Sequence, residues 1–261
     1  MHSSPFQEEL TTAIAAAQLS GDGLRQQFGK ALNIRHKGEI NLVTDADEAA
    51  EQAIVAEIRR HFPTDAVLAE EGTLGGSDMH RVWIIDPLDG TTNFAHGYPV
   101  FAVSIALEVD GIVQLGVVYQ PMRDELFCAR RNQGAQLNGE TIHVSSTDRL
   151  VSSLLCSGFS YARDEIRQAL PLWQDILLTA QAVRRDGAAA IDLCFVAAGR
   201  FDGFWERSLH PWDVAAGALM VAEAGGALSD YTGGNLDIRG RQIVASNGHI
   251  HADLVGFTAQ S

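Results

Sequence analysis

The 261-residue sequence has few cysteines, no recognisable leader and no long hydrophobic run. Its three cysteines, Cys128, Cys156 and Cys194, are far apart and form no Cys-x-x-Cys pair, which argues against a disulfide framework or a cysteine zinc site. The N-terminus lacks a basic segment followed by an apolar core, so no signal peptide is predicted. Polar residues and a proline interrupt the uncharged stretch 90–107, so it does not predict a membrane span. We therefore expect a soluble, cytoplasmic protein.

Basic side chains are also scarce. Lys and Arg total 19 against 33 Asp and Glu, which gives a formal net charge of −14. Nucleic-acid backbones and anionic membrane surfaces both attract basic patches, so this balance predicts neither a nucleic-acid nor a membrane partner. The simplest interpretation of the charge is solubility. The sharper interpretation is that some of the carboxylates converge to bind cations.

Two common catalytic motifs are missing. The sequence contains no Gly-x-x-x-x-Gly-Lys-Ser/Thr loop, which disfavours a P-loop nucleotide hydrolase or kinase. Ser160 lies in Gly-Phe-Ser-Tyr-Ala, and this differs from the Gly-x-Ser-x-Gly turn of serine hydrolases. The chemistry must therefore be sought among other side chains.

Hydrophobic spacing predicts helices mixed with short strands. A strong Asp-Gly hairpin signal separates two of the predicted strands, at residues 110 and 111. The predicted helices are 6–21, 44–62, 165–182, 188–198 and 214–224, and the predicted strands are 66–69, 82–85, 101–109, 112–119, 126–129, 201–205 and 243–246. The class is α/β or α+β with layered sheets. We expect a single domain, 1–261, with a first half, 1–147, that contains an antiparallel meander and a second half, 148–261.

The segment 83–93, Trp-Ile-Ile-Asp-Pro-Leu-Asp-Gly-Thr-Thr-Asn, carries the clearest chemical signal. A predicted apolar strand delivers Asp86 and Asp89 at its carboxyl end. Gly-Thr-Thr can then open a helix whose free N–H groups suit a phosphate. Hard cations prefer carboxylate oxygens, so the pattern suggests a metal site beside a phosphate site. The alternative is a structural loop in which Asp89 caps a helix.

A haloacid-dehalogenase-type aspartyl phosphatase is a rival interpretation. That mechanism uses Asp-x-Asp-Gly-Thr, in which alternation along the chain places both carboxylates on one face. Here the spacing is Asp-x-x-Asp, and Pro87 bends the chain. A turn that lets both carboxylates bind metal ions fits this spacing better than a single nucleophilic Asp.

Other acids have equally plausible structural roles. Glu70 and Glu71 follow a predicted strand and should point to opposite faces, so only one of them is expected to be a ligand. Asp213 begins a predicted helix and could simply cap it. Asp47 lies in the first turn of its helix, where the helix dipole favours an acid in any case. Spacing alone does not bring these residues together.

Taken together, these segments resemble the inositol monophosphatase family. Residues 83–93 are similar to its first signature, and residues 212–217, Trp-Asp-Val-Ala-Ala-Gly, followed by 223–226, Glu-Ala-Gly-Gly, are similar to its second. Further landmarks match in the same order along the chain. They are 41–47, 70–71, 187–193 and 245–248.

The resemblance implies a layered αβαβα sandwich of the inositol monophosphatase and fructose-1,6-bisphosphatase type, usually a homodimer. It implies Mg²⁺-dependent hydrolysis of a small polyol or sugar phosphate, with two or three Mg²⁺ ions per site and sensitivity to Li⁺. Inositol-1-monophosphatase is the foremost activity. Histidinol phosphate, fructose 1,6-bisphosphate and an adenosine bisphosphate remain alternative substrates. A non-catalytic binding or regulatory protein that keeps the fold remains an alternative of another class.

The resemblance also implies roles for individual residues. The metal ligands would be Glu70, Asp86, the carbonyl of Leu88, Asp89 and Asp213. Asp47 and Thr91 would orient the attacking water, and Glu70 would help to hold it. The substrate would contact Glu206, Asp213, Gly187, Ala188 and Ala189, with its phosphate on the backbone of Gly90, Thr91 and Thr92. Lys37 and His210 lie near positions of family residues close to the site. Ala188 stands where Ser or Thr is common, which leaves the identity of the alcohol open.

Overall fold

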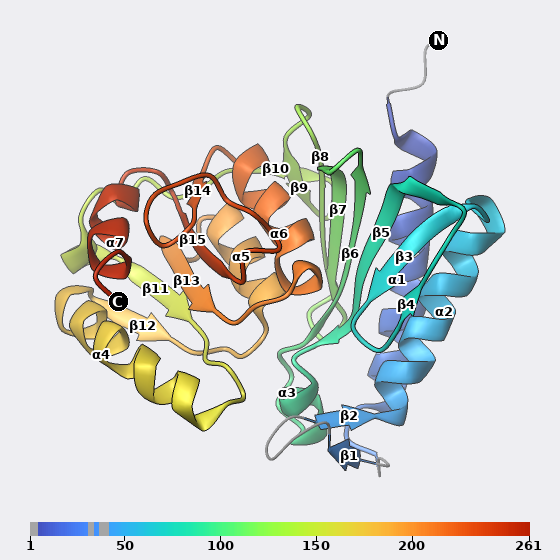
Figure 1. The fold of residues 1–261 in the computed structure, drawn as a ribbon, viewed down its shortest axis with the longest axis horizontal. Helices are drawn as coiled ribbons and strands as arrows, with labels where there is room; N and C mark the ends of the chain where they lie inside the picture. Colours follow the sequence, from blue (N-terminus) through green and yellow to red (C-terminus); the bar gives the residue numbers. More distant parts are fainter. Residues whose placement is uncertain (1–4, 31–33, 37–41) are drawn as a thin grey trace.

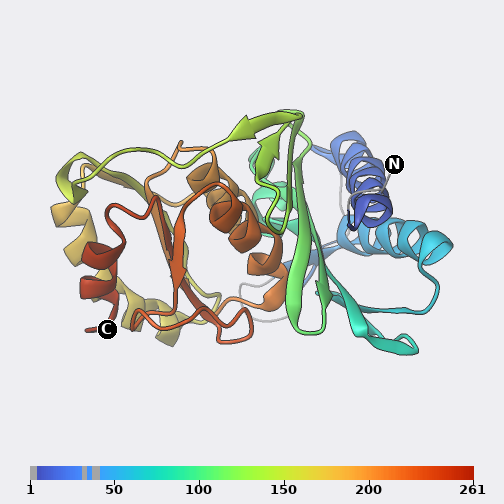
Figure 2. The same cartoon turned by 90° about the horizontal axis from the view of Figure 1, so that it is seen from above.

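A computed structural model describes residues 5–30, 34–36 and 42–261. Five layers stack across the molecule (Figures 1 and 2). Helices α4 and α7 cover a five-stranded sheet, α5 and α6 fill the middle, and an eight-stranded sheet carries α1 and α2 on its outer face. This arrangement confirms the predicted αβαβα sandwich.

The helices are α1 (Gln7–Gln27), α2 (Asp45–His61), α3 (Thr91–Ala95), α4 (Arg163–Thr179), α5 (Ala189–Ala197), α6 (Pro211–Glu223), α7 (His251–Thr258) and the 3-10 turn η1 (Leu150–Ser152).

The eight-stranded sheet has the order β10-β9-β8-β7-β6-β5-β3-β4. Its strands are β3 (Asp65–Ala69), β4 (Thr73–Leu74), β5 (Asp78–Asp89), β6 (Ala102–Val109), β7 (Ile112–Gln120), β8 (Glu125–Arg130), β9 (Ala135–Leu137) and β10 (Glu140–Ile142). All neighbours are antiparallel except β3 and β5. Asp110 and Gly111, both at positive φ, form the predicted hairpin turn between β6 and β7. A separate pair, β1 (Ile34–His36) and β2 (Leu42–Thr44), precedes α2.

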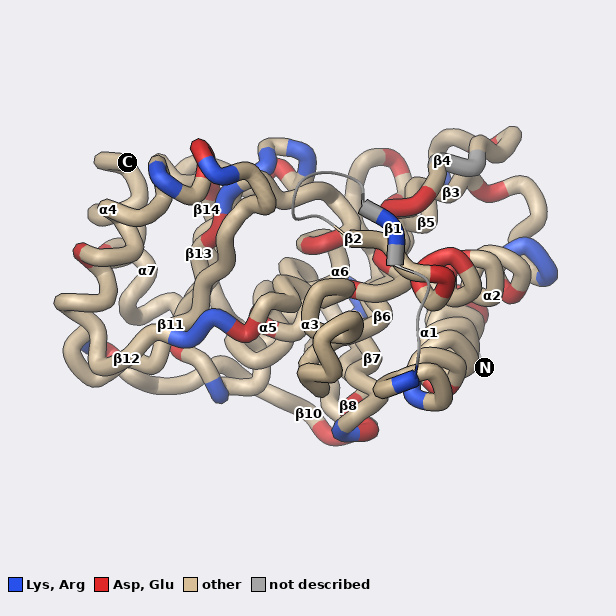
Figure 3. Tube along the Cα trace, turned by 90° about the horizontal axis from the view of Figure 1, so that it is seen from below, with Lys and Arg blue, Asp and Glu red and all other residues tan. Residues whose placement is uncertain are grey.

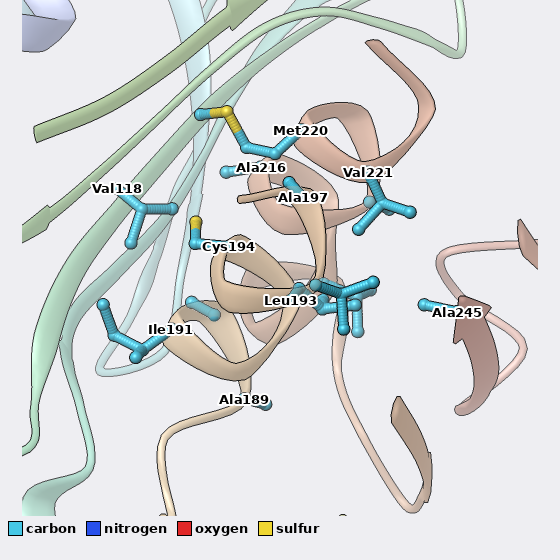
Figure 4. Close-up of a cluster of buried hydrophobic side chains, with 14 of the residues drawn as sticks. Val118, Ala189, Ile191, Leu193, Cys194, Ala197, Ala216, Met220, Val221 and Ala245 are labelled. Atoms are coloured by element: carbon cyan, nitrogen blue, oxygen red, sulfur yellow. The ribbon is translucent and has the colours of Figure 1, made fainter. Parts of the chain in front are cut away.

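The five-stranded sheet has the order β12-β11-β13-β15-β14. Its strands are β11 (Leu154–Ser157), β12 (Ala182–Arg184), β13 (Gly203–Arg207), β14 (Ala227–Ser229) and β15 (Gln242–Ser246). Between the two sheets, α5 is buried along its whole length and packs against α6 (Figure 4). Gly217 of α6 allows this close approach, because a Cβ there would lie 2.6 Å from the Leu193 side chain. A helix that is apolar on all sides is expected where sheets lie on both faces. The division at residue 147 stays a prediction.

Several predicted boundaries are wrong for physical reasons. α1 does not end near Gly21 but continues to Gln27. Gly21 is needed for close packing, because a Cβ there would lie 2.5 Å from the Tyr119 ring. The strand expected at 201–205 is 203–207, which brings Glu206 into β13. α6 begins at Pro211, three residues earlier than expected, since proline is well suited to the first helical position.

The remaining helix differences are smaller. α4 runs from Arg163 to Thr179 and accommodates Pro171 in its interior, whereas the prediction was 165–182. α2 begins at Asp45 after the N-cap Thr44, as predicted. Within the described ranges, no helix combines the length and apolar character needed to cross a membrane. Lys37 lies outside the described residues.

Candidate active site

The carboxyl end of β5 presents the two acids of the first motif. The pairing of β5 with β6 shifts register between Asp86 and Asp89, so the strand is irregular between the two acids, where the sequence predicted a turn. Asp86 Oδ1 accepts a hydrogen bond from the Leu88 N–H at 3.0 Å. Asp89 Oδ2 accepts one from the Ala190 N–H at 2.7 Å, at the beginning of α5. Each carboxylate is thus held by at least one backbone N–H group.

These acids face a cavity of about 520 Å³ at the junction of the layers. Figure 3 views the molecule from below and shows acidic segments on both sides of this junction, near β5, α2 and β13. The structure therefore brings together segments that the sequence separates by more than a hundred residues. The predicted site residues that line the cavity are Glu70, Asp86, Leu88, Asp89, Gly90, Thr91, Gly187, Ala188, Ala189, Glu206, His210 and Asp213.

Asp47 lies behind the cavity wall and is hydrogen-bonded to Thr91, which lines the cavity. Asp47 is fully buried, and its Oδ2 accepts from both the N–H and the hydroxyl of Thr44, at 2.8 and 2.6 Å. Its Oδ1 lies 2.9 Å from Thr91 Oγ1, which also lies 3.1 Å from the Leu88 carbonyl. Burial raises the pKa of Asp47, against these hydrogen bonds. The Asp47 side chain therefore caps the start of α2 with one oxygen and contacts Thr91 with the other.

Three of the cavity acids resist ionisation together. Burial raises the pKa of Asp86 well above its ordinary range, and the charges of Glu70, Asp89 and Asp213 raise it further. Burial also raises the pKa of Asp89, to about 7. The pKa of Asp213 is raised well above its ordinary range by burial and by neighbouring acids, although its Oδ2 accepts from the His210 N–H at 2.7 Å. Mutual repulsion shows that these carboxylates share one electrostatic environment.

The two adjacent glutamates behave differently, as their alternation predicted. Glu70 lines the cavity, and its N–H donates to the Ile85 carbonyl beside β5. Glu71 is not among the residues of the cavity wall, and its N–H donates to Glu51 on α2. Thr92 also lies outside the wall, and its hydroxyl is 3.3 Å from that of Tyr161.

Glycine is required at two points in this region. Gly90 has φ +93°, and a Cβ there would lie 2.9 Å from the Val100 carbonyl. Gly187 has φ +82°, and a Cβ there would lie 2.4 Å from Arg185 Nη1. Asn93 joins these segments, since its amide donates to the carbonyls of Val100 and Asp186 at 2.7 and 2.8 Å. These contacts fix the first motif against the start of α5.

Glu206 lies on the opposite side of the cavity, at the end of β13. It is 9% exposed, and burial raises its pKa to about 8, with a further increase from Asp192 and a decrease from Arg185. Gly158 makes room for it, because a Cβ at that position would lie only 2.2 Å from a Glu206 oxygen. The side chain is therefore confined between its strand and the 158–162 loop.

Some residues of the wall were missed by the sequence reasoning. Arg185, Arg207 and Arg241 place three cations on the cavity, and none of them lies in the motifs from which the site was predicted. His210 is exposed, and its ring stacks on Trp212 with centroids 4.7 Å apart and planes 11° apart. The double Arg at 184–185, directly before the Gly187 segment, was the only available hint for Arg185.

The donor set matches a hard divalent cation. Four carboxylates, Glu70, Asp86, Asp89 and Asp213, line one cavity together with Leu88, whose carbonyl is a further candidate ligand. As the side chains stand, no three His, Cys, Asp or Glu groups in the described ranges converge on a single metal position. The chemistry of these oxygens fits Mg²⁺, because carboxylates and carbonyls are the hard oxygen ligands that this ion binds.

Comparison with known proteins identifies the family. A family model described as the inositol monophosphatase family matches residues 6–260. Inositol-1-monophosphatase of Synechocystis is 47% identical over 96% of this chain and 88% of its own length.

Two other relatives extend the match. Nus factor SuhB of Pseudomonas aeruginosa is 42% identical over 93% of this chain and 92% of its own length. The solved structure of inositol monophosphatase from Anabaena superposes with a TM-score of 0.90 at 42% identity, covering 98% of this chain and 97% of that one. The chain therefore belongs to the inositol monophosphatase family, and its fold and motifs are those of a phosphatase of that superfamily.

Proposed function

We propose that this protein hydrolyses a phosphate monoester of a small polyol in a Mg²⁺-dependent reaction, with myo-inositol 1-phosphate as the foremost substrate. The observation that carries the proposal is the convergence of Glu70, Asp86, Asp89 and Asp213 on one cavity. Two buried and two partly buried acids around one cavity are costly for a folded protein unless cations offset their repulsion. Membership of a family of metal-dependent phosphatases supports the same conclusion.

Glu70, Asp86, the Leu88 carbonyl, Asp89 and Asp213 would hold two or three Mg²⁺ ions. Bound Mg²⁺ would neutralise the phosphoryl oxygens and the leaving alkoxide, and would lower the pKa of the attacking water. Asp86 is the central ligand in this proposal, because it responds electrostatically to all three of the other acids.

The chain itself would position the water. Thr91 Oγ1 can donate its proton to Asp47 Oδ1 at 2.9 Å, which directs an oxygen lone pair toward the cavity. A water that donates to this lone pair is oriented for attack. Asp47 cannot rotate away, because Thr44 holds its second oxygen with two hydrogen bonds. Phosphate would lie on the N–H groups at residues 90–92, where the short helix α3 begins.

The alcohol part of the substrate would lie between Glu206 and the segment 187–189. A carboxylate at Glu206 can accept hydrogen bonds from sugar hydroxyls, and Arg185 faces the same space. Ala188 presents a methyl group, where a hydroxyl would have added a contact. The wall thus suits a compact polyol, which we rank above histidinol phosphate, fructose 1,6-bisphosphate and an adenosine bisphosphate.

The test is a phosphate-release assay over these four substrates, each with Mg²⁺ and with EDTA. We expect release that needs Mg²⁺ and a higher kcat/KM for myo-inositol 1-phosphate than for the other three. Preference for another substrate would overturn the assignment of the alcohol but keep the phosphatase. Release that is equal with EDTA would overturn the metal-dependent mechanism.

A binding role remains the second candidate, since one relative is called a Nus factor. That role predicts no release from any of the four substrates at millimolar Mg²⁺. A homodimer in the cytoplasm is the accompanying expectation from the family resemblance, and the mass in solution by light scattering tests the dimer.

A further inference from the structure

The loop 158–162, between β11 and α4, lines the active-site cavity but supplies no group to the hydrolysis proposed above. All five of its residues belong to the cavity wall. It contains the Gly-Phe-Ser-Tyr-Ala segment, whose Ser160 does not fit a serine hydrolase. The side chain that follows this serine, Tyr161, connects the loop to the first motif.

Tyr161 reaches the end of the cavity where the phosphate is placed. Its phenol oxygen accepts a hydrogen bond from the Thr92 hydroxyl at 3.3 Å. Thr92 lies in the first turn of α3, and its backbone is part of the segment 90–92 on which the phosphate would lie. Because the Thr92 hydroxyl and N–H belong to one residue, a phosphoryl oxygen bound to that N–H would lie close to the phenol.

The phenol has a proton to offer to such an oxygen. A tyrosine hydroxyl carries one proton and can also accept a hydrogen bond. Thr92 uses the accepting side, and no acceptor for the proton of Tyr161 is found among the residues that the structure describes. The Tyr161 side chain lines the cavity and is 40% exposed, so a ligand in the cavity can reach its hydroxyl. Hydrogen bonds to charged acceptors such as phosphoryl oxygens are stronger than those between neutral groups.

Hydrogen bonds also fix the loop that carries Tyr161. Ser160 Oγ accepts from the Ala162 N–H at 3.0 Å, which forms a turn with Tyr161 at its centre. Ser160 further hydrogen-bonds to the Glu165 carboxylate on α4. The same carboxylate accepts from the hydroxyl of Ser208, which follows β13. The position of Tyr161 is therefore defined before a ligand arrives, and this reduces the entropy lost on binding.

We propose that Tyr161 is a substrate-binding residue whose hydroxyl donates a hydrogen bond to a non-bridging oxygen of the phosphoryl group. Thr92 would act as a positioning residue that holds the phenol. The ligands recognised in this way are the phosphate monoester and the inorganic phosphate released from it. This inference rests on the proposed function, because it gives a further contact to the phosphate placed there.

The direct test is a calorimetric titration of the Mg²⁺-loaded protein with inorganic phosphate, together with the phosphate-release assay. Tyr161→Phe keeps the ring and removes only the hydroxyl. We expect its Kd for inorganic phosphate and its KM for myo-inositol 1-phosphate to rise about tenfold, because a hydrogen bond to a charged group is lost. Tyr98→Phe is the matched control, since Tyr98 is 48% exposed but does not line the cavity, and both values should stay unchanged.

Thr92→Val tests whether the Thr92 hydroxyl acts through Tyr161. Thr92 does not line the cavity itself. Loss of its hydroxyl should therefore weaken phosphate binding in the otherwise unmodified protein, but should add little to the effect of Tyr161→Phe. Losses that add in full in the double variant would show that the two hydroxyls act independently, and would overturn the positioning role.

The outcomes separate this inference from the proposed function. Unchanged Kd and KM in a Tyr161→Phe protein that still releases phosphate would overturn the inference and leave the phosphatase. Phosphate binding that depends on Tyr161, in a protein that releases phosphate from no substrate, would support the inference and overturn the hydrolysis. An unmodified protein that neither binds nor releases phosphate would overturn both.

Discussion

Replacement of Glu206 by Gln should stabilise the metal-free protein, and the gain should grow with pH. The side chain is 9% exposed, and its burial raises the pKa to about 8. Between pH 4.5 and 8 the unfolded chain loses the proton at this position while the folded chain retains it. The unfolded state thus binds fewer protons, so the free energy of unfolding falls as pH rises through this window.

The magnitude follows from the two pKa values. From 4.5 to about 8, at about 1.4 kcal/mol per pH unit, the loss is at most about 5 kcal/mol. Between pH 5 and pH 7 it is about 3 kcal/mol. Gln has nearly the same shape and does not ionise, so Glu206→Gln should lack this loss. Below pH 4 the Glu206 side chain is protonated in both the folded and the unfolded protein. Glu206→Gln should therefore have no added stability from the missing charge at that pH.

Urea unfolding in EDTA at pH 5 and pH 7 measures this difference. We expect the free energy of unfolding of Glu206→Gln, relative to the unmodified protein, to increase by about 3 kcal/mol over that interval. Glu140→Gln is the matched control, since Glu140 is exposed on β10 and should show little change. Equal pH dependence for Glu206→Gln and the unmodified protein would refute the account of a buried, reluctantly charged Glu206.

Four further outcomes are expected. Asn93→Ala removes a buried hydrogen bond to Val100 and a partly buried one to Asp186, and should lower the free energy of unfolding in urea by about 2 kcal/mol. Gly158→Ala places a Cβ against the Glu206 carboxylate, so KM for myo-inositol 1-phosphate should rise about tenfold, the equivalent of about 1.4 kcal/mol, with a smaller change in kcat. Mg²⁺ should raise the melting temperature, because it binds the folded acids, and a melting temperature indifferent to Mg²⁺ would contradict that. Li⁺ at millimolar concentration should slow phosphate release in the presence of Mg²⁺.

The sequence predicted the layers well because their signals are local. The Asp-Gly turn and the apolar runs on either side of it are sufficient to define β6 and β7. The extent of α1 was mispredicted because Gly21 looks like a helix end, whereas the Tyr119 ring, far along the chain, is what requires glycine there. The spacing of apolar residues along a helix does not reveal a tertiary contact of this kind.

The sequence predicted the site residues that lie in a recognisable motif, but spacing alone did not predict those that join the site through tertiary packing. Asp86 and Asp89 are close in sequence, and the turn between them was inferred from spacing. Glu206 and Asp213 join them only through the packing of the two sheets around α5 and α6, which spacing could not show. Arg185 was missed because its position depends on the chain path before Gly187.

The central claim is that the buried acids at the end of β5 form the metal-dependent phosphatase site. The most direct measurement is phosphate release from myo-inositol 1-phosphate by Asp86→Asn at saturating Mg²⁺, with circular dichroism to establish that the variant is folded. The account predicts a folded protein whose turnover has fallen by orders of magnitude, because the substitution removes the acid that interacts with Glu70, Asp89 and Asp213. A folded Asp86→Asn with undiminished turnover would contradict it.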